Sequence, residues 1–245
     1  MLIYSTIKEF KAAGRKSFAL LVDPDGHDAT YFEHVARLGM DAGIDFFFVG
    51  GSLIADDVLE LCLSVIRSRT KIPVIIFPGS SLQINPNADA ILFLSLISGR
   101  NAEMLIGRQV TAAPYLRKSG LEVISTGYML IDSGKSTTAL YMSNTLPIPG
   151  DKPQIAACTA MAGAMLGLSL IYLDGGSGAA NPVSIAIISA VKEVVEVPII
   201  VGGGIRTPQQ AIDACSAGAD VIVVGNAAEK DPGLLRGLVE AVHNC

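Results

Sequence analysis

Short runs of apolar residues rich in Val, Ile, Leu and Phe recur along the chain, and most end in glycine, aspartate or serine. A continuous apolar run of this length is typical of a strand that is buried on both faces of a parallel sheet. Amphipathic segments with apolar residues at helical spacing separate most of the runs and end near a glycine, as a helix C-cap requires. The eight predicted strands cover residues 18–23, 46–51, 74–79, 90–95, 122–130, 170–176, 198–204 and 221–226.

This alternation of strands and helices indicates right-handed βαβ units and a parallel sheet. Eight strands are the number that closes a (β/α)₈ barrel, and a length of 245 residues fits one such barrel. We therefore predict an α/β protein with a modified TIM (β/α)₈ barrel that forms a single domain over residues 1–245. A doubly wound open sheet is the alternative, because a sequence does not show whether a sheet closes.

Two connections depart from the regular pattern. Residues 80–89, between the third and fourth strands, contain Asn and Pro without helical periodicity, so we predict a shortened connection and a thin barrel wall there. Residues 131–169, between the fifth and sixth strands, form an unusually long connection with a polar first half. Connections of this length are commonly lids or binding loops, so we place this one on the active face.

The stretch from Pro153 to Leu173 contains no charged residue and is long enough to cross a bilayer. Its Ala, Gly and Ser content and its end in a strand-and-glycine pattern favour a buried helix of roughly 12 residues that leads into a strand. Small residues in this helix would permit close packing or a subunit contact. We therefore predict no transmembrane span.

Composition narrows the function classes. Apolar residues make up 50% of the chain and charged residues 17%, and the formal net charge is −5. Neither the charge nor any basic cluster supports nucleic-acid binding. The four cysteines have no metal-binding spacing, and the first residues lack the apolar core of a signal peptide, so we expect reduced thiols and a cytoplasmic protein.

Glycines end the last three predicted strands, in the segments DGGSG, GGGIR and GN. The carboxyl ends of parallel barrel strands meet at one rim, where the seventh and eighth strands commonly bind phosphate through bare backbone N–H groups. Gly203 and Gly204 precede Pro208, which suits a first helical turn, and Gly225–Asn226 opens the last helix. Together they predict a phosphate-binding site, although any single glycine could merely form a turn.

Two aspartates at strand ends are candidates for chemistry. Asp23 begins the sequence Asp-Pro-Asp and would supply an oxygen ligand for Mg²⁺ near the phosphate, with the Ser52 hydroxyl as a second ligand. The alternative is an Asp-Pro turn in which Asp25 caps a helix. Asp174 would orient or deprotonate a substrate hydroxyl, or else cap the glycine-rich segment. The three histidines sit in or beside predicted helices, where roles facing solvent are favoured.

Several motifs together resemble the geranylgeranylglyceryl phosphate synthase family, which also contains the bacterial heptaprenylglyceryl phosphate synthases. The resemblance runs from about residue 17 to residue 245, and the middle of the chain is similar to the second group of that family. The motifs that carry it are VDPD, FVGGSL, FPGS, SLISGRN, GYMLIDSGKST, YMSNTLPIP, YLDGGSGA, VGGGIRTP and VGNAAEKDP.

The resemblance implies a cytoplasmic prenyltransferase of lipid biosynthesis. In this reaction the sn-3 hydroxyl of sn-glycerol 1-phosphate displaces diphosphate from a polyprenyl diphosphate, with geranylgeranyl diphosphate favoured, and forms an ether bond. By motif position, Asp23 and Ser52 would bind Mg²⁺, and Asp174 is the candidate base. Glycerol 1-phosphate would contact Tyr172, Leu173, Asp174, Gly175, Gly176, Ser177, Gly178, Gly203, Gly204, Gly225 and Asn226.

The resemblance also implies a homo-oligomer, either a dimer or a hexamer, with peripheral membrane contact left open. The sequence departs from the family where many members place a basic residue near the metal-binding Asp, because Leu21, Gly26 and His27 occupy those positions. Arg100 and Lys135 are therefore the candidate cations for diphosphate. Two alternatives remain: a sugar-phosphate isomerase or aldolase on the same type of barrel, and a barrel that binds phosphate without catalysis.

Overall fold

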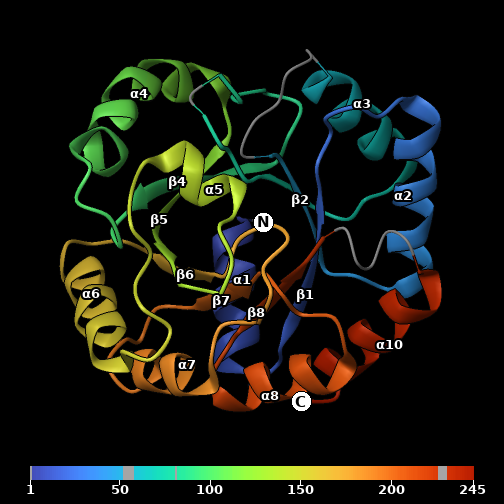
Figure 1. Ribbon diagram of the computed structural model, residues 1–245. Coiled ribbons are helices and arrows are strands. Elements are labelled where there is room, and N and C mark those ends of the chain that lie inside the picture. The colour runs from blue at the N-terminus through green and yellow to red at the C-terminus, as the bar shows by residue number, and fades with distance from the viewer. Residues whose placement is uncertain (1, 52–57, 81, 226–230) are drawn as a thin grey trace.

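The computed structural model describes residues 2–51, 58–80, 82–225 and 231–245, and its eight strands form a closed parallel barrel (Figure 1). Each strand pairs in parallel with the next, and the first strand pairs with the last, which closes the sheet. The predicted barrel is therefore confirmed, and the open sheet is excluded. The strands are β1 (Ser17–Val22), β2 (Phe46–Val49), β3 (Val74–Ile76), β4 (Ala90–Leu96), β5 (Glu122–Leu130), β6 (Leu170–Asp174), β7 (Ile199–Gly202) and β8 (Val221–Val224).

Helices surround most of the barrel, as Figure 1 shows. They begin and end as local sequence signals predict: Gly43 ends α2 in a left-handed conformation, and Thr207 with Gln210 forms a capping box that starts α8 at Pro208. The helices are α1 (Ile3–Ala12), α2 (Ala29–Ala42), α3 (Leu59–Arg69), the π-helix η1 (Glu103–Gly107), α4 (Arg108–Ser119), α5 (Thr138–Ser143), α6 (Pro153–Met165), α7 (Ile185–Lys192), α8 (Pro208–Ala217) and α10 (Pro232–His243).

Alternate residues along each strand belong to two different apolar layers. Phe46 and Phe48 of β2 belong to the core inside the barrel, whereas Phe47 belongs to the layer between strands and helices. The same alternation puts Tyr128 and Tyr172 inside. Because side chains along a strand point to opposite faces in turn, the residues two positions beyond an inward residue also point toward the barrel axis. Asp174 follows Tyr172 in this way.

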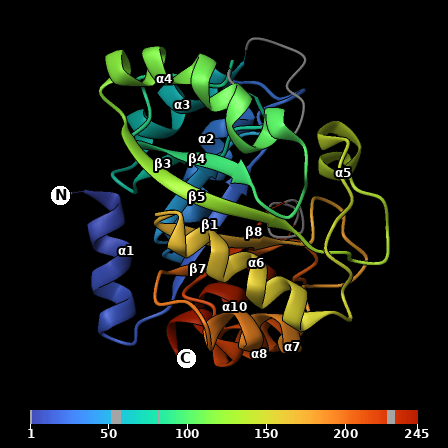
Figure 2. The same ribbon diagram turned by 90° about the vertical axis from the view of Figure 1, so that its left-hand side faces the viewer.

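The two ends of the barrel are closed differently. Helix α1 covers the amino-terminal end, and α5 lies over the opposite end, where the strands finish (Figure 2). Ile3 and Ile7 of α1 join the core inside the barrel. The Glu122 carboxylate at the start of β5 accepts hydrogen bonds from the backbone N–H groups of Ile3 and Tyr4, the latter at 2.9 Å. These contacts satisfy two of the free N–H donors of the first helical turn.

The connections from β3 to β4 and from β5 to β6 have the structures that the sequence predicts. No helix occurs between β3 and β4 in the described residues of that connection, so the barrel wall is thin there. The long connection from β5 to β6 carries α5 and α6, and α5 lies at the carboxyl ends of the strands (Figure 2). The first residues of this connection contact the loop that follows β6, where Asn181 donates hydrogen bonds to the Ser133 carbonyl oxygen.

The prediction of a buried helix between residues 153 and 173 was only half right. Helix α6 leads into β6 as expected, and Ala156 and Ala160 are buried against the barrel. Its other face is exposed: Ile155 is 49% accessible, Met165 79% and the following Leu166 82%. Small residues face inward because the helix lies close to the strands, which leaves the large apolar side chains outside. In the described part of the chain, no helix has the length and apolar character needed to cross a bilayer.

Candidate functional site

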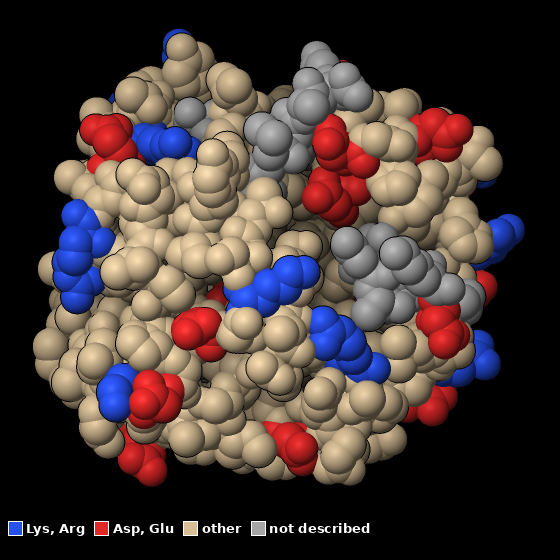
Figure 3. All heavy atoms as spheres, in the orientation of Figure 1, with Lys and Arg blue, Asp and Glu red and all other residues tan. Residues whose placement is uncertain are grey.

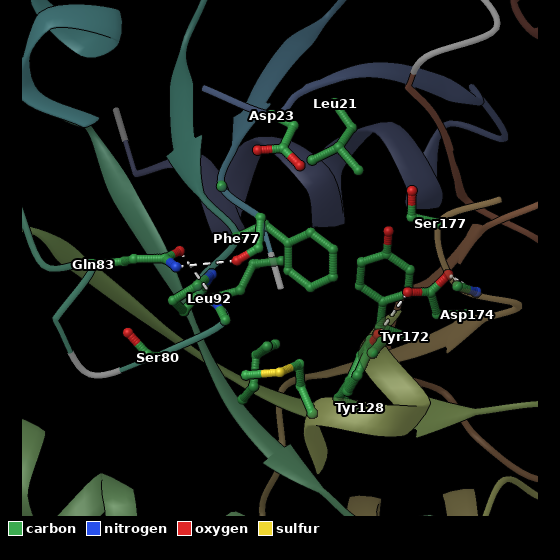
Figure 4. Close-up of a pocket in the computed structure, with 18 of the residues that line it drawn as sticks. Leu21, Asp23, Phe77, Ser80, Gln83, Leu92, Tyr128, Tyr172, Asp174 and Ser177 are labelled. Atoms are coloured by element: carbon green, nitrogen blue, oxygen red, sulfur yellow. Dashed lines mark hydrogen bonds between the residues drawn. The ribbon is translucent and has the colours of Figure 1, made fainter. Parts of the chain in front are cut away.

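A cavity of about 1110 Å³ opens at the carboxyl ends of the strands. It extends from the glycine loops after β6 and β7, past the ends of β1 and β2, to the connection between β3 and β4. Figure 4 shows Asp23, Gln83 and the group Tyr172, Asp174 and Ser177 around Phe77. On this end of the molecule the Lys and Arg side chains do not form a continuous patch (Figure 3).

The loops after β6 and β7 approach each other so closely that only glycine fits. Gly203 and Gly204 have φ values of +82° and +77°, which disfavour any side chain. A Cβ on Gly203 would lie 2.6 Å from the Gly176 nitrogen, and one on Gly204 would lie 2.5 Å from the Asn181 oxygen. Within the described residues, the backbone N–H groups of Ser177, Gly203 and Gly204 donate no hydrogen bond, so they are available to an anion.

Arg206 joins the two loops. Its guanidinium donates to the carbonyl oxygens of Ala180, at 3.0 Å, and of Ala179. Arg206 also lines the cavity. The two acceptors are uncharged, so the positive charge of the guanidinium is not cancelled by these contacts and contributes to the field beside the free N–H groups.

Asp174 is held at the rim of the barrel by two donors. Its Oδ2 accepts a 2.6 Å hydrogen bond from the Tyr128 hydroxyl, and its Oδ1 accepts a 2.7 Å hydrogen bond from the Gly176 N–H. Burial raises the pKa of Asp174 above its ordinary value, and the two hydrogen bonds oppose that rise. Burial and the neighbouring Asp174 charge raise the pKa of Tyr128 well above its ordinary value, so Tyr128 stays protonated as the donor.

Aromatic rings form one wall of the cavity beside the Asp174 carboxylate. Phe77 stacks on Tyr172 with ring centroids 5.0 Å apart, and Tyr128 meets both rings edge to face. Ring faces carry a partial negative charge, which attracts cations. The wall is therefore apolar and yet suited to a positively charged group.

Asp23 faces the cavity from the end of β1 (Figure 4). Burial raises its pKa, while the Asp25 N–H, 3.2 Å from Oδ1, lowers it. The alternative that Asp25 caps α2 is wrong, because Asp28 accepts the hydrogen bond from Tyr31 at that position. No cluster of three metal-binding His, Cys, Asp or Glu side chains occurs among the described residues. A single carboxylate still fits Mg²⁺, which takes its remaining ligands from water and substrate phosphates.

Part of the cavity is an apolar slot between β4, α4 and the connection that joins β3 to β4. Leu92 and Leu94 of β4 line it, together with Ala112 and Leu116 of α4. Gln109 of α4 also lines it, with its amide nitrogen bonded to the carbonyl oxygens of Met104 and Leu94. Arg108, at the start of α4, also lines the cavity. A largely apolar slot next to charged groups suits an amphiphilic ligand with a polar head and a long hydrocarbon tail.

The structure brings most of the predicted site residues together. The predicted residues that line the cavity are Asp23, Tyr172, Asp174, Gly176, Ser177, Gly178, Gly203, Gly204 and Gly225. Leu173 instead packs in the layer between strands and helices, because it is the outward residue of β6. Gly175 uses its N–H in a 3.0 Å hydrogen bond to the Gly202 oxygen and does not line the cavity. Ser52 and Asn226 lie outside the described residues.

The two candidate cations do not line the cavity. Arg100 turns back onto its own loop, where it donates to the carbonyl oxygens of Ile97 and Gly99 at 3.1 and 2.8 Å. Lys135 is exposed and is absent from the lining residues. The sequence did not single out Tyr128, Gln83 or Arg206 for the site. For Tyr128 a signal exists in the two-residue period of β5, which places Tyr128 and Leu130 on the same inward face.

Comparisons with known proteins agree with the resemblance. A family model described as the PcrB family matches residues 11–242. The geranylgeranylglyceryl phosphate synthase of Spirosoma linguale is 55% identical over 96% of this chain and 95% of that protein. The one from Thermococcus kodakarensis is 42% identical over 90% and 87%. A crystal structure of (S)-3-O-geranylgeranylglyceryl phosphate synthase from Thermoplasma acidophilum, in complex with sn-glycerol-1-phosphate, has a TM-score of 0.95 and 34% identity and covers 100% of both chains.

Proposed function

This chain belongs to the PcrB family, and from that premise we propose that it is a Mg²⁺-dependent geranylgeranylglyceryl phosphate synthase. The sn-3 hydroxyl oxygen of sn-glycerol 1-phosphate forms a bond to C1 of the polyprenyl diphosphate. The bond between C1 and the diphosphate oxygen breaks, and the diphosphate leaves with the electron pair. The hydroxyl proton passes to a base, and the products are 3-O-prenylglyceryl 1-phosphate and diphosphate.

The observation that carries this proposal is that one cavity contains everything the reaction needs. Free backbone N–H groups, a partly buried carboxylate at Asp23, a buried carboxylate at Asp174 and an apolar slot all open into the same space. Holding two substrates in one enclosure makes their reaction effectively unimolecular. The volume of about 1110 Å³ accommodates a small phosphate ester together with a long hydrocarbon chain.

We assign the phosphate of glycerol 1-phosphate to the glycine loops. The N–H groups of Ser177, Gly203 and Gly204 are the donors, and Gly225 leaves space on the β8 side. Asn226 stays a predicted ligand. The Arg206 charge supports the binding of the dianion.

Asp174 is the proposed base, and Tyr128 orients it. The Tyr128 hydroxyl fixes one carboxylate oxygen and the Gly176 N–H fixes the other, which aims the remaining lone pairs into the cavity. Burial raises the pKa of Asp174, which makes its carboxylate a better proton acceptor than an exposed one. A glycerol hydroxyl bound next to the phosphate loops lies on the same side of the cavity.

Asp23 is the proposed Mg²⁺ ligand, and Ser52 stays a predicted second ligand. The bound ion would neutralise charge on the departing diphosphate. The allylic group that remains carries delocalised positive charge, and the ring faces of Phe77, Tyr128 and Tyr172 beside it would stabilise that charge. Arg100 and Lys135 take no part in this arrangement.

The slot between β3, β4 and α4 is the proposed site of the prenyl chain. Each buried methylene contributes about 0.8 kcal/mol, so the depth of the slot sets a preference for chain length. The exposed apolar side chains of α6 support a homo-oligomer, because large apolar patches on a surface mark contact sites. We place the protein in the cytoplasm, where its four free thiols would stay reduced.

The test is an assay with Mg²⁺, sn-glycerol 1-phosphate and prenyl diphosphates of several lengths, with products identified by mass spectrometry. We expect a prenylglyceryl phosphate from at least one diphosphate, and product formation that stops when EDTA is added. A protein that is folded and forms no such product with any of the diphosphates would contradict the proposal. A Schiff-base aldolase is not supported, because no lysine is among the described residues that line the cavity.

A further inference from the structure

We propose that Gln83 is a positioning residue that sets the orientation of Asp23, acting through the backbone of Gly50 and Gly51. The inference rests on the proposed function, because it concerns how the Mg²⁺–diphosphate end of that site is held. Gln83 belongs to the connection between β3 and β4 and lines the cavity (Figure 4).

The Gln83 side chain joins two loops that end neighbouring strands. Its Oε1 accepts a 3.0 Å hydrogen bond from the Gly79 N–H, on its own connection. Its Nε2 donates a 3.0 Å hydrogen bond to the Gly51 carbonyl oxygen, on the loop after β2. Gln83 is 5% exposed, so both contacts are shielded from water. A buried amide that uses both ends in this way fixes the distance between the two loops.

The loop after β2 is also in direct contact with Asp23. A Cβ on Gly51 would lie 2.6 Å from Oδ1 and 2.9 Å from Oδ2 of Asp23, so the bare backbone of Gly51 lies against this carboxylate. Gly50 lies equally close to the other loop, since a Cβ on Gly50 would be 2.1 Å from the Phe77 oxygen. A shift of Gly51 would therefore change the position that the Asp23 carboxylate takes.

The fold explains why a side chain has this task. In a regular barrel a helix follows each strand and packs on the sheet, which holds the strand ends in place. No helix occurs among the described residues between β3 and β4. Gln83 supplies the missing brace, and as a neutral amide it adds no positive charge that would compete with the metal ion for Asp23. The thin wall that admits the prenyl chain and the need for Gln83 thus have the same origin.

The experiment measures binding of Mg²⁺–diphosphate by titration calorimetry, with sn-glycerol 1-phosphate as an internal reference on the same protein. Gln83→Met keeps the size of the side chain and removes both hydrogen bonds. We expect the dissociation constant of Mg²⁺–diphosphate to rise about 10- to 100-fold, as it does when partners of a metal ligand are removed. The dissociation constant of glycerol 1-phosphate should stay within about twofold, because its loops do not touch Gln83. Gln209→Met, on the exposed side of α8, is the matched control and should change neither constant.

A second variant leaves Gln83 in place. Gly51→Ala puts a methyl group against the Asp23 carboxylate, which must rotate away, and we expect the same selective loss of Mg²⁺–diphosphate affinity. This variant tests the link even if Gln83→Met does not fold, which a thermal melt reveals. The inference is overturned if either folded variant binds Mg²⁺–diphosphate as the wild type does, or if both ligands weaken equally. If the proposed function itself is wrong, the outcome differs, because the wild-type protein would then bind neither ligand and form no prenylglyceryl phosphate.

Discussion

Replacing Gly203 by alanine tests the assignment of the phosphate to the glycine loops. At φ = +82° an alanine costs about 1–2 kcal/mol relative to glycine. The new methyl group would also lie 2.6 Å from the Gly176 nitrogen and 2.8 Å from the Gly175 nitrogen, so the loops must separate. Overpacking of this kind costs about 1–3 kcal/mol. We therefore expect Gly203→Ala to lose about 2–5 kcal/mol of the free energy of unfolding.

Gly120→Ala is the matched control. Gly120 ends α4 at φ = +75°, and a Cβ there meets no atom within 4 Å. This variant has the backbone strain without the crowding, so it should lose only about 1–2 kcal/mol. At about 2–4 °C per kcal/mol for a chain of this size, its melting temperature should fall less than that of Gly203→Ala. The difference between the two variants isolates the closeness of the loops.

The assay is steady-state kinetics with varied sn-glycerol 1-phosphate at saturating prenyl diphosphate. When the loops around Gly203 separate, at least one N–H no longer reaches the phosphate, and a hydrogen bond to a charged group contributes about 1.5–3 kcal/mol. The KM for glycerol 1-phosphate should therefore rise about 10- to 150-fold in Gly203→Ala and stay near the wild-type value in Gly120→Ala. Equal KM values in the two variants, alongside the expected loss of stability, would refute the assignment.

Three further substitutions test separate parts of the account. Asp23→Asn should lower product formation at saturating substrates at least 100-fold, because the carboxylate holds the metal ion at the diphosphate end. Binding of glycerol 1-phosphate, measured by calorimetry, should not weaken. Turnover near the wild-type value would count against the role of Asp23. Tyr128→Phe removes a hydrogen bond that lowers the pKa of Asp174, so that pKa rises further, and the acidic limb of the kcat–pH profile should move to higher pH. If the limb stays in place, Asp174 is not the group that must be ionised. Glu122→Gln weakens the cap on α1 and should cost about 1–3 kcal/mol of unfolding free energy. The melting temperature should fall while KM stays unchanged. An unchanged melting temperature would show that the cap contributes little.

The barrel and the rim of the site could be predicted because both follow from short-range patterns. Each strand is a compact apolar run, and each run stops at the residue where the chain reaches the rim. Once parallel strands are inferred, their carboxyl ends must meet, so Asp23, Asp174 and Gly203 come together although they are far apart in sequence. The two-residue period of β6 also explains why the predicted ligand Leu173 is not in the site: it points outward, because the neighbouring Tyr172 belongs to the core inside the barrel.

Other features depend on contacts that no local pattern encodes. The bond from Tyr128 to Asp174 requires the register of β5 against β6, and the contacts of Gln83 require the loop after β2 to lie beside the connection that lacks a helix. Arg100 sits in a motif of the family, yet its guanidinium satisfies the carbonyl groups of its own tight loop. Helix α6 looked buried because it has no charge, whereas its small residues face the barrel and its large ones face outward.

The most direct measurement is the structure of this protein with sn-glycerol 1-phosphate bound. We predict the phosphate within hydrogen-bonding distance of the Gly203 and Gly204 N–H groups, and a glycerol hydroxyl in contact with the Asp174 carboxylate. The apolar slot beside Leu92 would then be open next to that hydroxyl. A phosphate bound at Asp23 instead, or a glycerol hydroxyl that points away from Asp174, would contradict the arrangement on which the proposed reaction depends.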